Sequence, residues 1–198
     1  MSLLLVDLSK FKSTDKIALP SIGSIQHLAL AMAAKDQLGE AKALDMNVVN
    51  MSSPEAYQAV VSKQEVKAHM ATPPYSNLSL ETEGHQLVLD SSKYLGEDAS
   101  VIIAVGSSKL HENNPKVYES INEALSETID YIYNNLDETS EFLAQKEGLE
   151  VETMKRYLES DDISYQQDTK GIVELATFMK EEGYITKVDS EDAYIFEK

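Results

Sequence analysis

The stretch that decides the fold is K-I-A-L-P-S-I-G-S-I-Q-H, residues 16–27. Its apolar run at residues 17–19 predicts a buried strand, which Pro20 ends because proline has no N–H to give to a sheet. Gly23 allows the backbone to turn tightly, and a helix is predicted to begin near Ile25. A strand, a turn of small residues and a helix N-terminus form the first unit of an α/β protein.

The turn after this strand has two interpretations. Ser21 or Ser24 can cap the new helix, as in an ordinary strand-to-helix connection. The first N–H groups of a helix also lack partners within it. A ligand carboxylate, sulfonate or other acceptor can therefore bind there, helped by the positive end of the helix dipole. The local sequence leaves both interpretations open.

Strands and helices alternate through the first half of the chain. Helices are predicted at residues 25–34, 54–63 and 75–80. The second is preceded by Ser52 or Ser53 as N-cap and has Pro54 at its first helical position. Four further apolar runs are typical of strands, at residues 47–51, 66–71, 86–90 and 100–106. The last of these is the most strongly β-forming and is expected at the centre of the sheet. The alternation predicts an α/β fold of three layers, with a mostly parallel sheet flanked by helices.

The second half is predicted to be helical. Pro115 opens a long amphipathic helix to about Asn135, with an apolar stripe on one side and acids opposite. Three more helices are predicted, at residues 137–146, 151–158 and 171–182. We therefore expect residues 1–110 to form an α/β lobe and residues 111–198 to form C-terminal helices that pack on it.

Composition limits the possible partners. The 198 residues are enough to bury a core, and their formal net charge of -17 disfavours binding to nucleic acid or to an anionic membrane surface. Arg156 is the one arginine in the sequence, so an anionic ligand would depend on backbone N–H groups and hydroxyls, with a lysine as the available side-chain cation. The absence of cysteine excludes disulfides and thiolate chemistry. No apolar run has the length of a membrane helix.

The sequence favours binding over catalysis. The histidines at 27, 69, 85 and 111 do not have the close helical spacing of zinc sites, so we expect structural or surface histidines and no metal. No phosphate-binding glycine loop or nucleophile elbow occurs, and the acids lie on helix faces and in caps. We expect no cofactor and no catalytic residue.

Three junctions between a strand and the following helix remain as the candidate site. In a parallel sheet they meet at the carboxyl ends of the strands, where α/β folds bind ligands. The first junction would hold one end of a small polar or anionic solute through backbone and hydroxyl donors, and the other two would line the same edge. The predicted ligand-binding residues are Ser21, Gly23, Ser24, Ile25, Gln26, Ser52, Ser53, Thr72 and Tyr75.

From Asp7 onward the chain resembles the solute-binding proteins of ABC importers in the aliphatic sulfonate, nitrate, taurine and thiamine-precursor group. Six segments occur in the order of that family. They are L-S-K-F-K-S-T-D-K-I-A-L-P-S-I-G-S, M-S-S-P-E-A-Y-Q-A-V, V-K-A-H-M-A-T-P-P-Y-S, N-P-K-V-Y-E-S-I-N-E-A-L-S-E-T-I-D-Y-I-Y-N-N, A-Q-K-E-G-L-E-V-E-T-M-K-R-Y and F-M-K-E-E-G-Y-I. Gly23-Ser24 is similar to the family's ligand loop.

The resemblance implies a type II periplasmic binding fold, a non-enzymatic role, an ABC permease as partner and an extracytoplasmic location. Complete members begin with a secretion signal, often a lipid-carrying cysteine, and a first lobe of about a hundred residues. We therefore expect this chain to be truncated, with the second lobe, the C-terminal helices and half of the binding site. Its exposed interlobe face is expected to favour a homodimer.

Two alternatives belong to other classes. The first is an enzyme on the same fold that makes a pyrimidine or menaquinone precursor, with His27 as general base. A histidine in the first turn of a helix is more often at the surface or in a cap. The second alternative is the effector-sensing domain of a transcription regulator, which would need a basic DNA-binding segment that this sequence does not contain.

Overall fold

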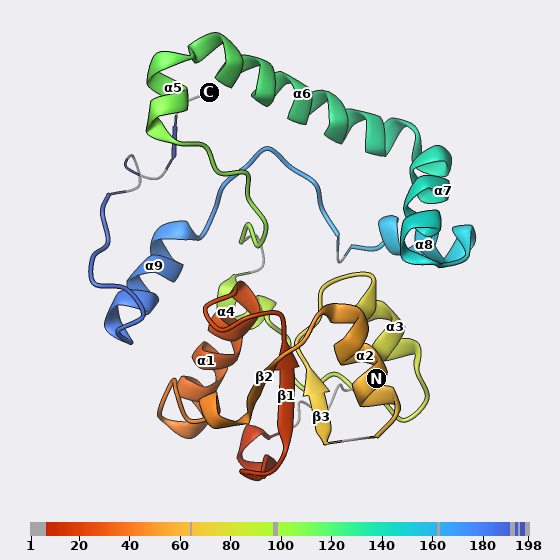
Figure 1. Cartoon of the computed structure of the whole chain (residues 1–198), viewed down its shortest axis with the longest axis vertical. Coiled ribbons are helices and arrows are strands. Elements are labelled where there is room, and N and C mark those ends of the chain that lie inside the picture. Colours follow the sequence, from red (N-terminus) through yellow and green to blue (C-terminus); the bar gives the residue numbers. More distant parts are fainter. Residues whose placement is uncertain are drawn as a thin grey trace. The chain divides into compact units, whose positions relative to one another are not determined.

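The computed structural model describes residues 7–63, 65–96, 99–161, 163–190, 193 and 195–196. Contacts divide the chain into two compact units (Figure 1). Unit 1 comprises the described residues of Met1–Val101 and Gly171–Val188, and unit 2 those of Ile102–Lys170 and Asp189–Lys198. The predicted division into residues 1–110 and 111–198 stays a prediction.

Unit 1 contains a parallel sheet of three strands in the order β2-β1-β3. The strands are β1 (Lys16–Leu19), β2 (Val48–Asn50) and β3 (Val66–His69). Ala18 in the central strand lies opposite Val49 on one side and His69 on the other. The prediction of an α/β fold with a parallel sheet flanked by helices is confirmed at this level, and the type II fold stays a prediction.

Alternate residues of β1 pack on opposite faces of the sheet. Ile17 and Leu19 belong to a core cluster with Leu30 of α1 (Ile25–Leu38), whereas Ala18 packs with Ala56 of α2 (Ser53–Val61). The two helices therefore cover opposite faces, and Figure 1 shows them on either side of the strands. The remaining elements of unit 1 are η1 (Leu8–Lys10), η2 (Asp45–Asn47), α3 (Tyr75–Glu81), α4 (Ser92–Leu95) and α9 (Ile172–Glu181).

Two predicted strands are wrong, because residues 86–90 and 100–106 have no regular structure. Val88 and Leu89 pack against the core cluster under α1, so the apolar residues of the first run fill space beside the sheet instead of extending it. In the second run Ile102 is 82% exposed. β-forming side chains favour a strand only where a neighbouring strand and a packing surface are present.

Unit 2 is built from four helices among its described residues. They are α5 (Ser108–Asn113), α6 (Pro115–Asn134), α7 (Leu136–Glu147) and α8 (Val151–Leu158). Ala144, Met154 and Leu158 form the core between α7 and α8. The predicted long amphipathic helix is present as α6, but its apolar stripe is not buried, since Val117 is 50% exposed and Ile121 43%.

Candidate functional site

The candidate site lies at the carboxyl edge of the sheet, between β1 and β3. From β1 the chain crosses to β2 through α1 on one face of the sheet, and from β2 it returns past β1 to β3 through α2 on the other face. The helix α3, which follows β3, packs against α2, so the loops after β1 and β3 leave the sheet toward opposite faces. In open α/β sheets this topological switch point is where ligands bind.

The loop after β1 is a tight turn that leads into α1. Ser24 N–H donates to Ser21 O at 3.2 Å, and Gly23 between them has φ +84°, a conformation that favours glycine. Ser24 is the N-cap of α1, and its hydroxyl accepts the N–H of His27 at 3.3 Å. The N–H groups of Ile25 and Gln26 have no acceptor among the described residues. They are the backbone donors that this junction offers to a solute.

The N–H of Gly23 is used inside the protein. It donates to Nδ1 of His27 at 3.2 Å, which joins the turn to the first turn of α1. Of the five predicted residues of this junction, Gly23 therefore contributes its backbone conformation, whereas Ser21 and Ser24 retain hydroxyl hydrogens that can be donated.

His27 is buried, contrary to the expectation of a surface or capping position, with 1% of its area exposed. Its Nε2 lies 3.2 Å from Oδ1 of Asp45 in η2, and its ring meets that of Tyr184 edge-on with centroids 5.7 Å apart. Both ring nitrogens thus have partners within unit 1. This arrangement holds the loop after β1 and gives the imidazole no open path to a solute.

The junction after β2 is a helix cap that carries a negative charge. Oε2 of Glu55 accepts both the N–H of Ser52, at 3.0 Å, and its hydroxyl, at 2.7 Å. These two bonds lower the pKa of the Glu55 carboxyl below its usual value. Ser53 is the first residue of α2. Because a carboxylate stands here, an anionic solute is better placed toward β3 than toward β2.

The junction after β3 presents aromatic and hydroxyl groups. Thr72 is half-buried, and its carbonyl accepts the N–H of Ser76 at 3.1 Å at the start of α3. The Tyr75 ring lies against that of Tyr57 of α2, with centroids 6.2 Å apart. Neighbouring strands are about 4.8 Å apart, so the loops after β1 and β3 begin close enough to each other to contact one small solute.

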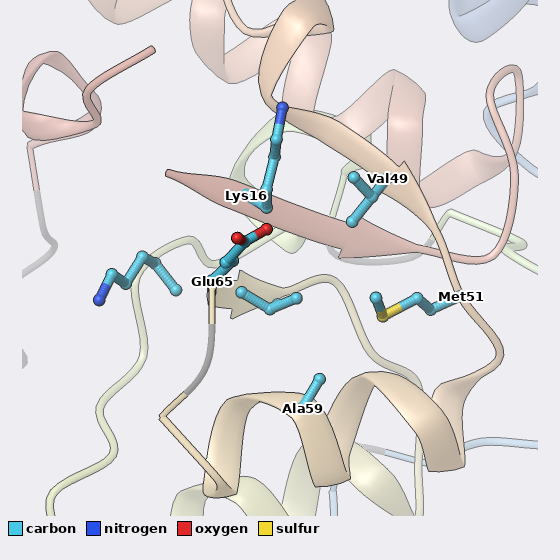
Figure 2. A pocket seen from close by; sticks show the side chains of 7 residues that line it. Lys16, Val49, Met51, Ala59 and Glu65 are labelled. Atoms are coloured by element: carbon cyan, nitrogen blue, oxygen red, sulfur yellow. The ribbon is translucent and has the colours of Figure 1, made fainter. Parts of the chain in front are cut away.

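A pocket of about 690 Å³ lies elsewhere, on the face of the sheet that α2 covers. Figure 2 shows Val49, Met51 and Ala59 around it, with Lys16 and Glu65 at the amino ends of β1 and β3. The ammonium of Lys16 donates to Met46 O at 3.2 Å. None of the nine predicted residues lines this pocket. Val66 of its lining belongs to the core cluster beneath α2, and Val49, Met51 and Ala59 pack against that cluster.

Sequence reasoning did not assign Asp45 or Tyr184 to the site. Both contact His27 from far along the chain, and nothing near them in the sequence predicts that contact. The position of His27 four residues after Gly23 was a usable signal, because that spacing brings a side chain of the first helical turn back over the loop.

The described residues contain no group of three or more potential metal-ligating side chains. Within the same part of the chain, no helix is long and apolar enough to cross a membrane. Comparison of the chain with protein-family models, curated proteins and solved structures found no match.

Proposed function

We propose that unit 1 is a solute-binding lobe that holds a small polar or anionic solute at the switch point between β1 and β3. The observation that carries this proposal is the sheet order β2-β1-β3 with α1 and α2 on opposite faces, which makes the carboxyl ends of β1 and β3 a topological switch point with a helix-starting loop after each strand. The N–H groups of Ile25 and Gln26 and the hydroxyls of Ser21 and Ser24 are its donors.

These donors suit a solute with hydrogen-bond acceptors, whether or not the solute carries a full negative charge. The N-terminus of α1, a helix of 14 residues, supplies N–H groups and a partial positive charge. No arginine lies in this loop. A sulfonate, a nitrate, a taurine or a pyrimidine with ring acceptors fits this chemistry. In keeping with the resemblance of the sequence, the chain acts in this proposal as part of the extracytoplasmic component of an ABC importer and delivers the solute to a permease.

The test is a titration of the ¹⁵N-labelled chain with taurine, sodium nitrate and sodium ethanesulfonate, with sodium chloride at equal ionic strength as the control. We expect one of the three to shift the amide signals of Ile25, Gln26 and Thr72 selectively. Shifts confined to residues outside the loops after β1 and β3 would contradict the proposed site. A flat response to all three would contradict binding of this solute class by the chain.

A matched pair of glycine variants separates binding from folding. Gly23 has φ +84° and Gly39 has φ +82°, and neither would bring a new Cβ within 4 Å of another group. Alanine at either position should cost about 1–2 kcal/mol in the free energy of unfolding because of the left-handed backbone. Only Gly23→Ala should weaken solute binding, since Gly39 lies at the far end of α1. Equal affinity in the two variants would exclude this loop as the contact.

A further inference from the structure

The loop after β1, which offers donors to the solute, is hydrogen-bonded to the buried imidazole of His27. Gly23 N–H donates to Nδ1 of His27 at 3.2 Å, and His27 N–H donates to the Ser24 hydroxyl at 3.3 Å. One residue therefore bonds to two residues of the turn, once through its side chain and once through its backbone. The turn itself is exposed at Ser21 and Gly23, whereas His27 is almost completely buried.

The hydrogen bonds define the tautomer of this imidazole. A backbone N–H can only donate, so Nδ1 must carry a lone pair to accept it. Nε2 then carries the proton and donates to Oδ1 of Asp45 at 3.2 Å. The carboxylate, whose side chain is 40% exposed, selects this tautomer because it can only accept.

The segment after α9 completes the support. The Tyr184 ring packs edge-on against the His27 ring. The Tyr184 ring also has Nζ of Lys42 5.0 Å from its centre. The Tyr184 hydroxyl is buried without a hydrogen-bond partner among the described residues, so this side chain serves packing. Two parts of the chain distant in sequence, η2 and the segment after α9, thus fix the orientation of His27.

We infer that His27 is the positioning residue of the solute loop: as a neutral, Nε2-protonated imidazole set by Asp45, it holds Gly23 and Ser24 in the conformation that presents the N–H groups of Ile25 and Gln26. The link to solute binding rests on the proposed function. The hydrogen bonds of His27 do not depend on the proposed function, and they can be measured in the protein without solute.

The first experiment records the imidazole ¹⁵N signals and the hydrogen exchange of the Gly23 amide in the chain without solute. We expect an unprotonated Nδ1 and a protonated Nε2. In His27→Phe, which keeps a ring beside Tyr184, the Gly23 amide should exchange about tenfold faster, the ratio that corresponds to one net hydrogen bond. A protonated Nδ1 in the wild type, or unchanged exchange in His27→Phe, would overturn the inference.

Variants of Asp45 keep the inference testable if His27→Phe does not fold. Asp45→Ala removes the acceptor that selects the tautomer, so the Nδ1 signal should move toward a mixture of tautomers and Gly23 exchange should rise. Asp45→Asn can still accept the Nε2–H through its amide oxygen and should restore both signals toward the wild type. An effect of the Asp45 charge alone would not predict this rescue. Identical spectra for Asp45→Ala and the wild type would refute the role of the carboxylate.

A taurine titration of the same variants separates the two proposals. If the wild type binds taurine, Asp45→Ala and His27→Phe should bind it more weakly, and Asp45→Asn should bind it nearly as well as the wild type. Unchanged taurine affinity in a variant whose Gly23 amide has become labile would overturn the positioning role. If the wild type does not bind taurine, the proposed function fails for this solute, while the tautomer and exchange results still decide the arrangement of the loop.

Discussion

Burial lowers the pKa of His69 below its usual value of 6.5, and the nearby His85 lowers it further. Nε2 of His69 lies 2.6 Å from the Ser79 hydroxyl, whereas its Nδ1 is buried without a partner. The unfolded chain therefore takes up a proton at a higher pH than the folded chain does. Stability from this histidine is complete above about pH 6.5 and is lost as the pH falls through the folded-state pKa.

We predict that His69→Gln reduces the dependence of unfolding free energy on pH below about pH 6.5, where one extra proton in the unfolded state contributes at most about 1.4 kcal/mol per pH unit. Urea unfolding followed by circular dichroism at a series of pH values measures the slope. His111→Gln is the control, because it leaves His69 intact and should retain the wild-type slope. A slope in His69→Gln as steep as that of the wild type would show that other groups cause the acid sensitivity.

At the residue scale, prediction from sequence worked where the signal is local. Gly23 in a tight turn and Ser24 as a cap follow from conformational and hydrogen-bonding preferences of single residues, and both are observed. The burial of His27 was not predicted, because it depends on Asp45 and Tyr184, which the fold brings from elsewhere. Long-range contacts of this kind have no pattern in a single sequence.

The cap of α2 is a local element whose contribution is measurable. Glu55 accepts two hydrogen bonds from Ser52, and Pro54 stands in the first turn. We predict that Glu55→Ala lowers the unfolding free energy by about 1 kcal/mol, the usual effect of losing a helix cap. Gln58→Ala, one turn later on the exposed side, should have a much smaller effect. Equal urea midpoints for the two variants would mean that the cap adds nothing in solution.

The run at residues 100–106 allows a second test at the scale of elements. Ile102 is 82% exposed, whereas Val66 in β3 is 5% exposed. We predict that Ile102→Lys changes the unfolding free energy by no more than about 0.5 kcal/mol, as for ordinary surface substitutions. Val66→Lys should prevent stable folding, because it buries an unpaired charge. Severe destabilisation by Ile102→Lys would mean that Ile102 is buried in solution, as the predicted strand at residues 100–106 requires.

These outcomes explain why some elements were predictable. α8 and the three observed strands have clear apolar patterns with turn or cap residues at their ends, and they occur where the sequence places them. Residues 86–90 and 100–106 have the same apolar character without a neighbouring strand. The composition of a segment indicates its preference for the strand conformation, but a strand forms only where a neighbouring strand pairs with it.

At the scale of the whole molecule, exposed apolar residues bear on self-association. Val105 is 89% exposed, and the α6 stripe includes Val117 at 50%. The expected homodimer through the interlobe face stays a prediction. We propose in addition that these exposed apolar residues favour self-association, against the repulsion of a net charge of -17. Light scattering over a range of protein and salt concentrations tests it. Salt should favour the dimer by screening, and a strict monomer at high protein concentration in high salt would contradict it.

The two compact units have separate cores, so we predict that each unit loses stability mainly through its own buried residues. Leu19 is completely buried in the cluster beneath α1, and Met154 is 5% exposed between α7 and α8. Leu19→Ala and Met154→Ala should each cost about 2–5 kcal/mol, because each leaves a cavity. Hydrogen exchange read by peptide should show lost protection over unit 1 in the first variant and over unit 2 in the second. Equal loss across both units in either variant would mean that they unfold as one cooperative body, in which case the division by contacts has no thermodynamic counterpart.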